Sequence, residues 1–108
     1  MAYNLNLAER IRAELGGIPV VEKKMFGGVG FLLNGNMACG VNKDNLIVRV
    51  DPGKQVGLLE RPHVKLFDLT GRPMKGWLMV EPKGYEAPEQ LHAWIREGME
   101  FALTLPPK

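Results

Sequence analysis

The stretch that most constrains the fold is Lys24–Val41, in which two apolar runs flank the pair Asn34-Gly35. Asn-Gly is the commonest sequence for a two-residue type I′ turn, because both residues tolerate a positive φ. Apolar runs of strand length on both sides of such a turn are typical of a β-hairpin. We therefore expect the chain to fold around an antiparallel pair of strands in this stretch.

A two-residue loop also fixes which residues face each other across the hairpin. The expected facing pairs are Leu33 with Asn36, Phe31 with Ala38, and Val29 with Gly40. The opposite face of the hairpin then carries Leu32, Met37, Gly30 and Cys39. Each large side chain meets a small one, which suits a sheet face against which another element packs closely. The glycines leave room for that element or for a bulge.

Length and composition indicate a single globular domain over residues 1–108, since a second domain would not fit. With 45% hydrophobic and 24% charged residues, the chain resembles neither a disordered nor a membrane-embedded protein. No apolar run approaches the roughly 20 residues needed to span a bilayer, and residues 1–15 lack the apolar core of a signal peptide. A single cysteine, Cys39, excludes an intramolecular disulfide. We therefore expect a cytoplasmic protein that does not bind membranes.

The order of elements predicts an α+β fold, with an antiparallel sheet of about five strands and the N- and C-terminal helices packed on one face. Connections between the first three strands are too short for the crossover helices of a parallel sheet. Asn6 is expected to cap the first helix, and Pro88 to lie in the first turn of the last one. The expected elements are a helix over about 5–15, the hairpin strands, a strand over 46–50, a short helix over 54–61, strands near 63–67 and 77–81, and a helix over 88–105.

The net charge of +2 is too small to indicate nucleic-acid or membrane binding by itself, but the charges are unevenly distributed. Residues 61–83 are mainly basic, whereas the last helix carries Glu86, Glu89, Glu97 and Glu100 against Arg96. Two interpretations stay open. The charges can be solvated faces that balance each other, or they can form a surface for a ligand or partner.

Five residues form the candidate ligand- or partner-binding set: Lys24, Arg49, Arg72, Lys75 and Trp77. Alternation along the strand over 46–50 directs Leu46, Val48 and Val50 toward the helices, and Arg49 with Ile47 to the other side. Arg72, Lys75 and Trp77 put two cations and an aromatic ring into one turn, which suits an anion or an acidic partner. The alternative is that these are exposed turn cations beside a core tryptophan.

The residues form no recognisable catalytic or metal-binding motif. The chain has no serine, and Cys39 is expected to fill a small buried position on a hairpin strand. His63 and His92 lie on different elements, and with a single cysteine they match no metal-ligand spacing. His92 is expected on the surface of the last helix. The sequence therefore predicts no catalytic residue, no metal and no cofactor.

Several segments, considered together, carry a family resemblance: Lys23–Phe31, Asn34-Gly35, Leu46–Val50, Phe67-Asp68, Gly71–Trp77 and Leu91–Leu105. They resemble the N-terminal domain of the TfoX/Sxy family of competence regulators. The resemblance implies an α+β domain, similar in class to secretion-chaperone folds, and a role in the transcription of DNA-uptake genes. It implies no catalytic residues. The regulators carry a further C-terminal helical domain, and we expect this chain to be a stand-alone version of the N-terminal one.

The leading hypothesis is a non-enzymatic regulatory or protein-interaction module that binds protein partners through a sheet face or edge. The alternative is a small-anion or nucleotide-binding protein, an enzyme among the options, that uses the basic cluster around Arg49, Arg72 and Lys75. Direct nucleic-acid binding is a third hypothesis, although the chain has no recognised nucleic-acid-binding module. A homodimer formed through an exposed sheet edge also stays open.

Overall fold

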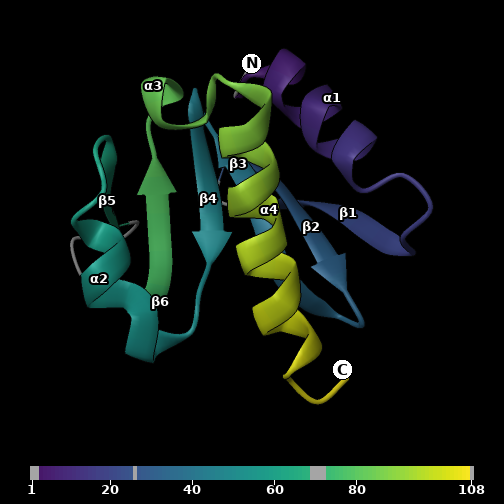
Figure 1. The fold of residues 1–108 in the computed structure, drawn as a ribbon. Helices are drawn as coiled ribbons and strands as arrows, with labels where there is room; N and C mark the ends of the chain where they lie inside the picture. The colour runs from purple at the N-terminus through teal and green to yellow at the C-terminus, as the bar shows by residue number, and fades with distance from the viewer. Residues whose placement is uncertain (1–2, 26, 69–72, 108) are drawn as a thin grey trace.

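The structure, a computed structural model, describes residues 3–25, 27–68 and 73–107 and shows a layer of helices against an antiparallel sheet (Figure 1). The predicted α+β class is confirmed. Within the described residues, no helix is long and apolar enough to cross a membrane. The helices are α1 Leu5–Glu14, the 3₁₀ helix η1 Pro52–Lys54, α2 Gln55–Leu59, α3 Pro82–Tyr85 and α4 Pro88–Leu103. The strands are β1 Val20–Met25, β2 Gly28–Leu33, β3 Asn36–Asn42, β4 Asn45–Arg49, β5 Val64–Asp68 and β6 Pro73–Val80.

The six strands are ordered β1-β2-β3-β4-β6-β5, so β1 and β5 form the two edges of the sheet. Each neighbouring pair is antiparallel, as the short connections predict. The strand that the sequence analysis missed is β1, which pairs with β2 along its whole length. Its apolar pattern is interrupted by three exposed charged residues, Glu22, Lys23 and Lys24. Charged side chains are common on edge strands, where they discourage pairing with other chains.

All the α-helices pack on the same face of the sheet, since each of them contributes buried residues to one large core. Helix α4 crosses β3 and β4 (Figure 1) and approaches them closely at Gly98. A Cβ atom on Gly98 would lie 2.3 Å from the carbonyl oxygen of Ala38 and 3.4 Å from Cγ1 of Val48. The predicted alternation along β4 is confirmed, because Leu46, Val48 and Val50 are buried in this core.

A β-bulge changes the register that the sequence predicts for the hairpin of β2 and β3. The pair Leu33 with Asn36 is confirmed. Beyond it the register shifts, so that Phe31 pairs with Cys39 and Ala38 is left without a partner. The predicted pair of Phe31 with Ala38 is therefore wrong, because the turn controls the register only as far as the first irregularity in the ladder.

The bulge also places Cys39 and Gly40 on the opposite faces of the sheet from those predicted. Val29 pairs with Val41 rather than with the predicted Gly40, and Gly40 pairs with Gly30. Cys39 was expected on the face opposite Phe31, but the shift turns it to the helix side, where it is fully buried. The two glycines thus lie together on the other face of the sheet.

Two element boundaries differ from the predicted ones for local reasons. Asn4, rather than Asn6, caps α1, and its side-chain oxygen accepts a hydrogen bond of 2.9 Å from the backbone N–H three residues later. Strand β6 begins at Pro73 rather than at Trp77. It continues through Gly76, whose φ of 84° is accessible to glycine at little cost.

The contact at Gly98 tests this packing directly. We expect Gly98→Ala to lower the free energy of unfolding by about 2 kcal/mol, because overpacking against a backbone oxygen outweighs the roughly 1 kcal/mol that alanine gains in helix propensity. Urea unfolding followed by circular dichroism measures the change.

Gly57→Ala is the matched control, because Gly57 also lies in a helix and a Cβ atom there would meet no atom within 4 Å. This variant should gain about 0.5–1 kcal/mol, since alanine favours the helix and restricts the unfolded chain. A Gly98→Ala protein that is as stable as Gly57→Ala would contradict the close approach of α4 to β3.

Candidate functional site

The sheet face opposite the helices carries a second apolar cluster, here called the strand face. Its members come from all six strands, whereas the buried apolar residues of the described helices belong to the core on the other side. The strand face is thus built from strand residues alone. It consists of Met25, Leu32, Met37, Ile47, Phe67, Trp77 and Met79.

The strand face is partly exposed to solvent and contains flexible methionine side chains. Its members Met37, Ile47 and Phe67 are buried, whereas those on β1, β2 and β6 are half-buried. A Cβ atom on Gly30 would lie 3.0 Å from Sδ of Met25 and 3.1 Å from Sδ of Met37, so both thioethers lie over the glycine backbone. Methionine is flexible and polarizable, and it adapts to irregular surfaces. The strand face can therefore fit its shape to a partner.

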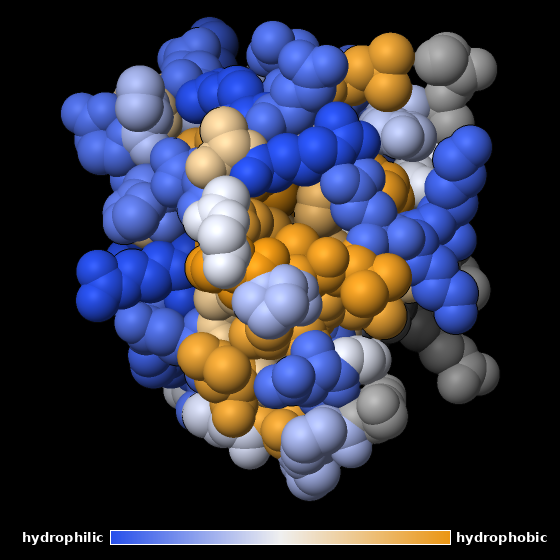
Figure 2. Space-filling model, turned by 90° about the vertical axis from the view of Figure 1, so that its right-hand side faces the viewer, coloured by the Kyte–Doolittle hydropathy of each residue, from blue (hydrophilic) through white to orange (hydrophobic). Residues whose placement is uncertain are grey.

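Edge strand β1 extends this apolar surface to the side of the molecule. Val21 of β1 pairs with Leu32 of the strand face, and its side chain is 65% exposed. Figure 2 looks onto the side where α1 and β1 lie and shows an apolar area bordered by hydrophilic side chains. Ile18, just before β1, is also exposed. An edge strand additionally offers unpaired backbone N–H and C=O groups to another strand.

Arg49 and Trp77, two residues of the predicted site, lie together. They pair across β4 and β6, and the guanidinium carbon of Arg49 is 5.2 Å from the centroid of the Trp77 ring. Phe101 of α4 lies 5.7 Å from the same carbon. No described carboxylate forms an ion pair with Arg49, so aromatic rings are the neighbours of its charge. The sequence places Phe101 in the apolar stripe of the last helix, and only the tertiary fold brings it to Arg49.

Gln55, which the sequence analysis did not single out, holds the backbone beside this pair. Its side chain is buried at the start of α2. The side-chain oxygen accepts a hydrogen bond of 3.2 Å from the Gly76 N–H, and the amide nitrogen donates one of 3.1 Å to the carbonyl of Trp77. A polar residue at the start of a short helix gives no signal for such a role, because its pattern is that of an exposed residue.

Of the other predicted site residues, Lys24 does not join this pair. Lys24 is exposed on β1, and two strands, β2 and β3, separate it from β4, which places it about 14 Å away at the usual strand spacing. Lys24 pairs with Val29, whose side chain is in the core on the helix side of the sheet. Lys24 therefore also lies on the helix side, opposite the strand face. Lys75 is exposed on β6. Arg72, with the centre of the predicted turn, lies outside the described residues.

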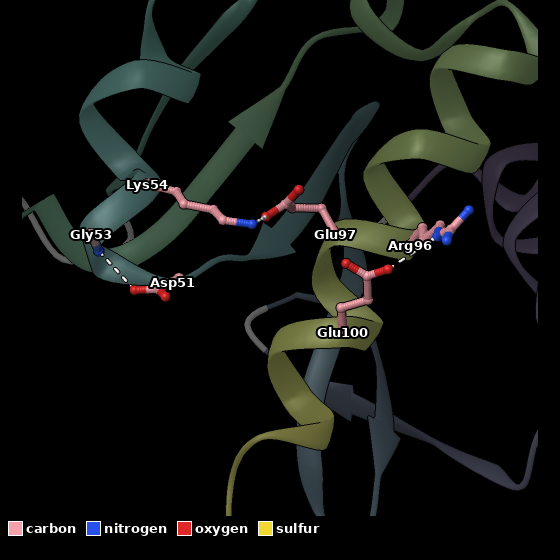
Figure 3. A network of polar contacts seen from close by, with 6 residues as sticks. All are labelled: Asp51, Gly53, Lys54, Arg96, Glu97 and Glu100. Carbon is pink, nitrogen blue, oxygen red and sulfur yellow. Dashed lines mark hydrogen bonds and ion pairs between the residues drawn. The ribbon is translucent and has the colours of Figure 1, made fainter.

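Two acidic residues of the last helix, Glu97 and Glu100, are paired with nearby cations (Figure 3). Glu97 accepts a hydrogen bond of 3.2 Å from Nζ of Lys54, and Glu100 accepts one of 3.1 Å from Nε of Arg96. The Asp51 carboxylate accepts a hydrogen bond of 2.8 Å from the backbone N–H two residues later. Such solvent-exposed pairs contribute at most about 1 kcal/mol each. They favour the interpretation that the charges here are balanced, solvated faces.

Cys39 and His92 have structural environments. Burial raises the pKa of the Cys39 thiol to about 12, so the thiol is protonated at neutral pH and packs as a small apolar group, as predicted. His92 is exposed, as predicted, but its Nδ1 lies 2.7 Å from Oε1 of Glu14 and so connects α4 to α1. In the part of the chain that the structure describes, no group of three His, Cys, Asp or Glu side chains is placed to hold a metal ion.

Comparison with protein families gives one relevant finding. A model described as the TfoX N-terminal domain matches residues 13–102. Comparisons with curated proteins and with solved structures gave no match. The family match extends from the last turn of α1 almost to the end of α4 and includes every strand of the sheet. The chain therefore belongs to the TfoX N-terminal domain family.

Proposed function

We propose that this TfoX N-terminal domain is a non-enzymatic protein-interaction module that binds a protein partner through the strand face and the β1 edge. The observation that carries the proposal is the make-up of the strand face, in which apolar side chains from all six strands lie together without a helix. Covering half-buried apolar side chains contributes roughly 25 cal/mol per Å² of area removed from water. Accessible apolar side chains that lie together are typical of binding sites.

Three further features suit a protein as the partner. Met25, Met37 and Met79 give the surface flexible side chains that can repack against different shapes. Arg49 and Trp77 at one end are of residue types that carry much of the binding energy in protein interfaces. Strand β1 can also accept an added strand through its free backbone groups.

Family membership supports a regulatory purpose for this contact. The resemblance to competence regulators implies action in transcription, and we infer that the domain serves regulation by holding a protein partner. Most DNA binding is driven by electrostatic attraction to the phosphates, and a net charge of +2 provides little of it. Binding to a protein is therefore better supported than binding to DNA. A second copy of this chain is one partner that the test below identifies.

The alternative of a small-anion or nucleotide site at Arg49 has less support. Arg49 is free of a carboxylate partner among the described residues, which favours an anion. Its neighbour Phe101, however, shares a cavity with three carboxylates, those of Asp51, Glu97 and Glu100, against the single cation Lys54, and this excess of negative charge disfavours an anion. We therefore rank protein binding first.

The buried thiol tests the non-enzymatic part of the proposal. At mildly alkaline pH, a thiol-specific reagent such as Ellman's reagent should react with Cys39 only as fast as the native protein opens, because burial keeps the thiol protonated and inaccessible. In concentrated guanidinium chloride, the single cysteine should react at once. Immediate reaction of the native protein would show that the Cys39 thiolate is accessible. It would contradict the non-enzymatic proposal, because Cys39 could then act as a nucleophile.

Site-specific photo-cross-linking in cells tests the proposed surface and does not require the partner to be identified first. A photoreactive phenylalanine analogue in place of Val21 should give a discrete adduct, because this exposed side chain lies beside the strand face. Met79→Gln in the same protein should reduce the yield, since it makes the strand face more polar. The mass of the adduct, compared with the 12.0 kDa chain, distinguishes a second copy from another protein.

Val56 provides the matched control for this experiment. It is the same residue type and is 74% exposed, but it lies on α2, on the helix side of the sheet. The probe at Val56 should not give the adduct that forms from Val21. Absence of an adduct at Val21, or equal yields of the same adduct from both positions, would contradict the proposed binding surface.

A further inference from the structure

A cavity of about 140 Å³ lies on the helix side of the sheet, between the segment that follows α2 and the first turns of α4. Figure 1 shows where α3 leads into α4 at the end of β6, next to this place. Besides Trp94, three of the lining side chains carry N–H groups, those of Arg61, His63 and Gln90. The cavity and the strand face thus lie on opposite sides of the sheet.

Arg61 is exposed and lies over an aromatic ring. Its guanidinium carbon lies 5.2 Å from the centroid of the Trp94 ring. Trp94 is buried, and its indole N–H donates a hydrogen bond of 3.2 Å to the carbonyl of Gly84, which fixes the ring. No carboxylate of the described residues pairs with Arg61. A guanidinium that stacks on a ring keeps its N–H edge available for a planar or bidentate acceptor.

His63 lies at the cavity in a backbone conformation that is costly for a residue with a side chain. Its φ is 64°, in the left-handed region, which is strained for a residue with a side chain. Its carbonyl accepts a hydrogen bond of 2.8 Å from the Glu81 N–H, which fixes the segment. Glycine at position 84 permits the approach, since a Cβ atom there would lie 3.2 Å from Cβ of His63. Strained residues that border a cavity are candidates for function.

Gln90 supplies the third donor from the first turn of α4. Its side-chain oxygen accepts a hydrogen bond of 2.9 Å from the Ala87 N–H, so the amide NH₂ group is the end that remains to donate. Among the described residues, no Asp or Glu lines the cavity. The three side chains therefore surround a space that has several donors and no carboxylate from the described part of the chain.

We propose that this cavity binds a small oxyanion, a carboxylate or phosphate group, with Arg61 as the charged donor and His63 and Gln90 as further donors. Charge-assisted bonds from a guanidinium to an oxyanion are the strongest available to these residue types. A cavity of about 150 Å³ accommodates benzene. The space here thus suits a group of about five or six heavy atoms, such as phosphate or a short carboxylate.

The two tryptophans allow a test with an internal control, because Trp94 lines the cavity and Trp77 lies on the strand face. Their indole N–H signals are followed by NMR while sodium phosphate or, separately, sodium acetate replaces sodium chloride at constant ionic strength. A saturable shift of the Trp94 signal, with the Trp77 signal unchanged, supports the site. The anion that saturates it identifies the class, and no saturable shift with either anion overturns the proposal.

Arg61→Gln should weaken the binding of the saturating anion at least about tenfold, because the charged donor is lost. Arg96→Gln is the matched control, since Arg96 is an exposed arginine of α4 that pairs with Glu100 (Figure 3) and does not line this cavity. It should bind the anion as the wild type does. Unchanged binding by Arg61→Gln, or an equal loss in both variants, overturns the proposal.

Discussion

The close approach of α4 to the middle of the sheet is the contact on which the rest of the structure depends. At Gly98 the helix backbone meets the strand backbone, because a Cβ atom would lie 2.3 Å from the carbonyl oxygen of Ala38. Ala38 is also the residue that the β-bulge leaves without a partner. The irregularity that shifts the hairpin register therefore lies directly under the helix, and the two features belong to one packing arrangement.

Because the helices share one side of the sheet, the two faces of the sheet differ in chemistry. The helix side is filled by branched and aromatic side chains and contains the buried thiol of Cys39. The strand face has Met25 and Met37 over the glycines of β2 and β3 and Trp77 beside Arg49. The close packing on the helix side contributes to stability. The flexible methionine side chains of the strand face suit the protein contact that we propose. The proposed function follows from this division.

Local signals predicted the architecture well, since Asn34-Gly35 forms the expected hairpin turn and short connections make the sheet antiparallel. Alternation along β4 also predicted the burial of Leu46, Val48 and Val50 under the helices, whereas the Arg49 guanidinium, expected on the other side, lies 5.7 Å from Phe101 of α4. The sequence allowed for a bulge beside the glycines but did not place it, and the edge strand β1 was missed, because neither has a strong local pattern. In the site, the contact of Arg49 with Phe101 and the hydrogen bonds of Gln55 join segments far apart in sequence, so only tertiary packing defines them.

The central claim is that the helices occupy one face of the sheet and leave the other to strand residues. Nuclear Overhauser spectroscopy of the methyl-labelled protein measures this most directly. The account predicts cross-peaks from the Hα protons of Gly98 to a methyl group of Val48, since Cγ1 of Val48 lies 3.4 Å from the Cβ position of Gly98. It predicts none between α4 and the methyl groups of Ile47 or Met79. Cross-peaks from α4 to those methyl groups, without the one to Val48, would contradict it.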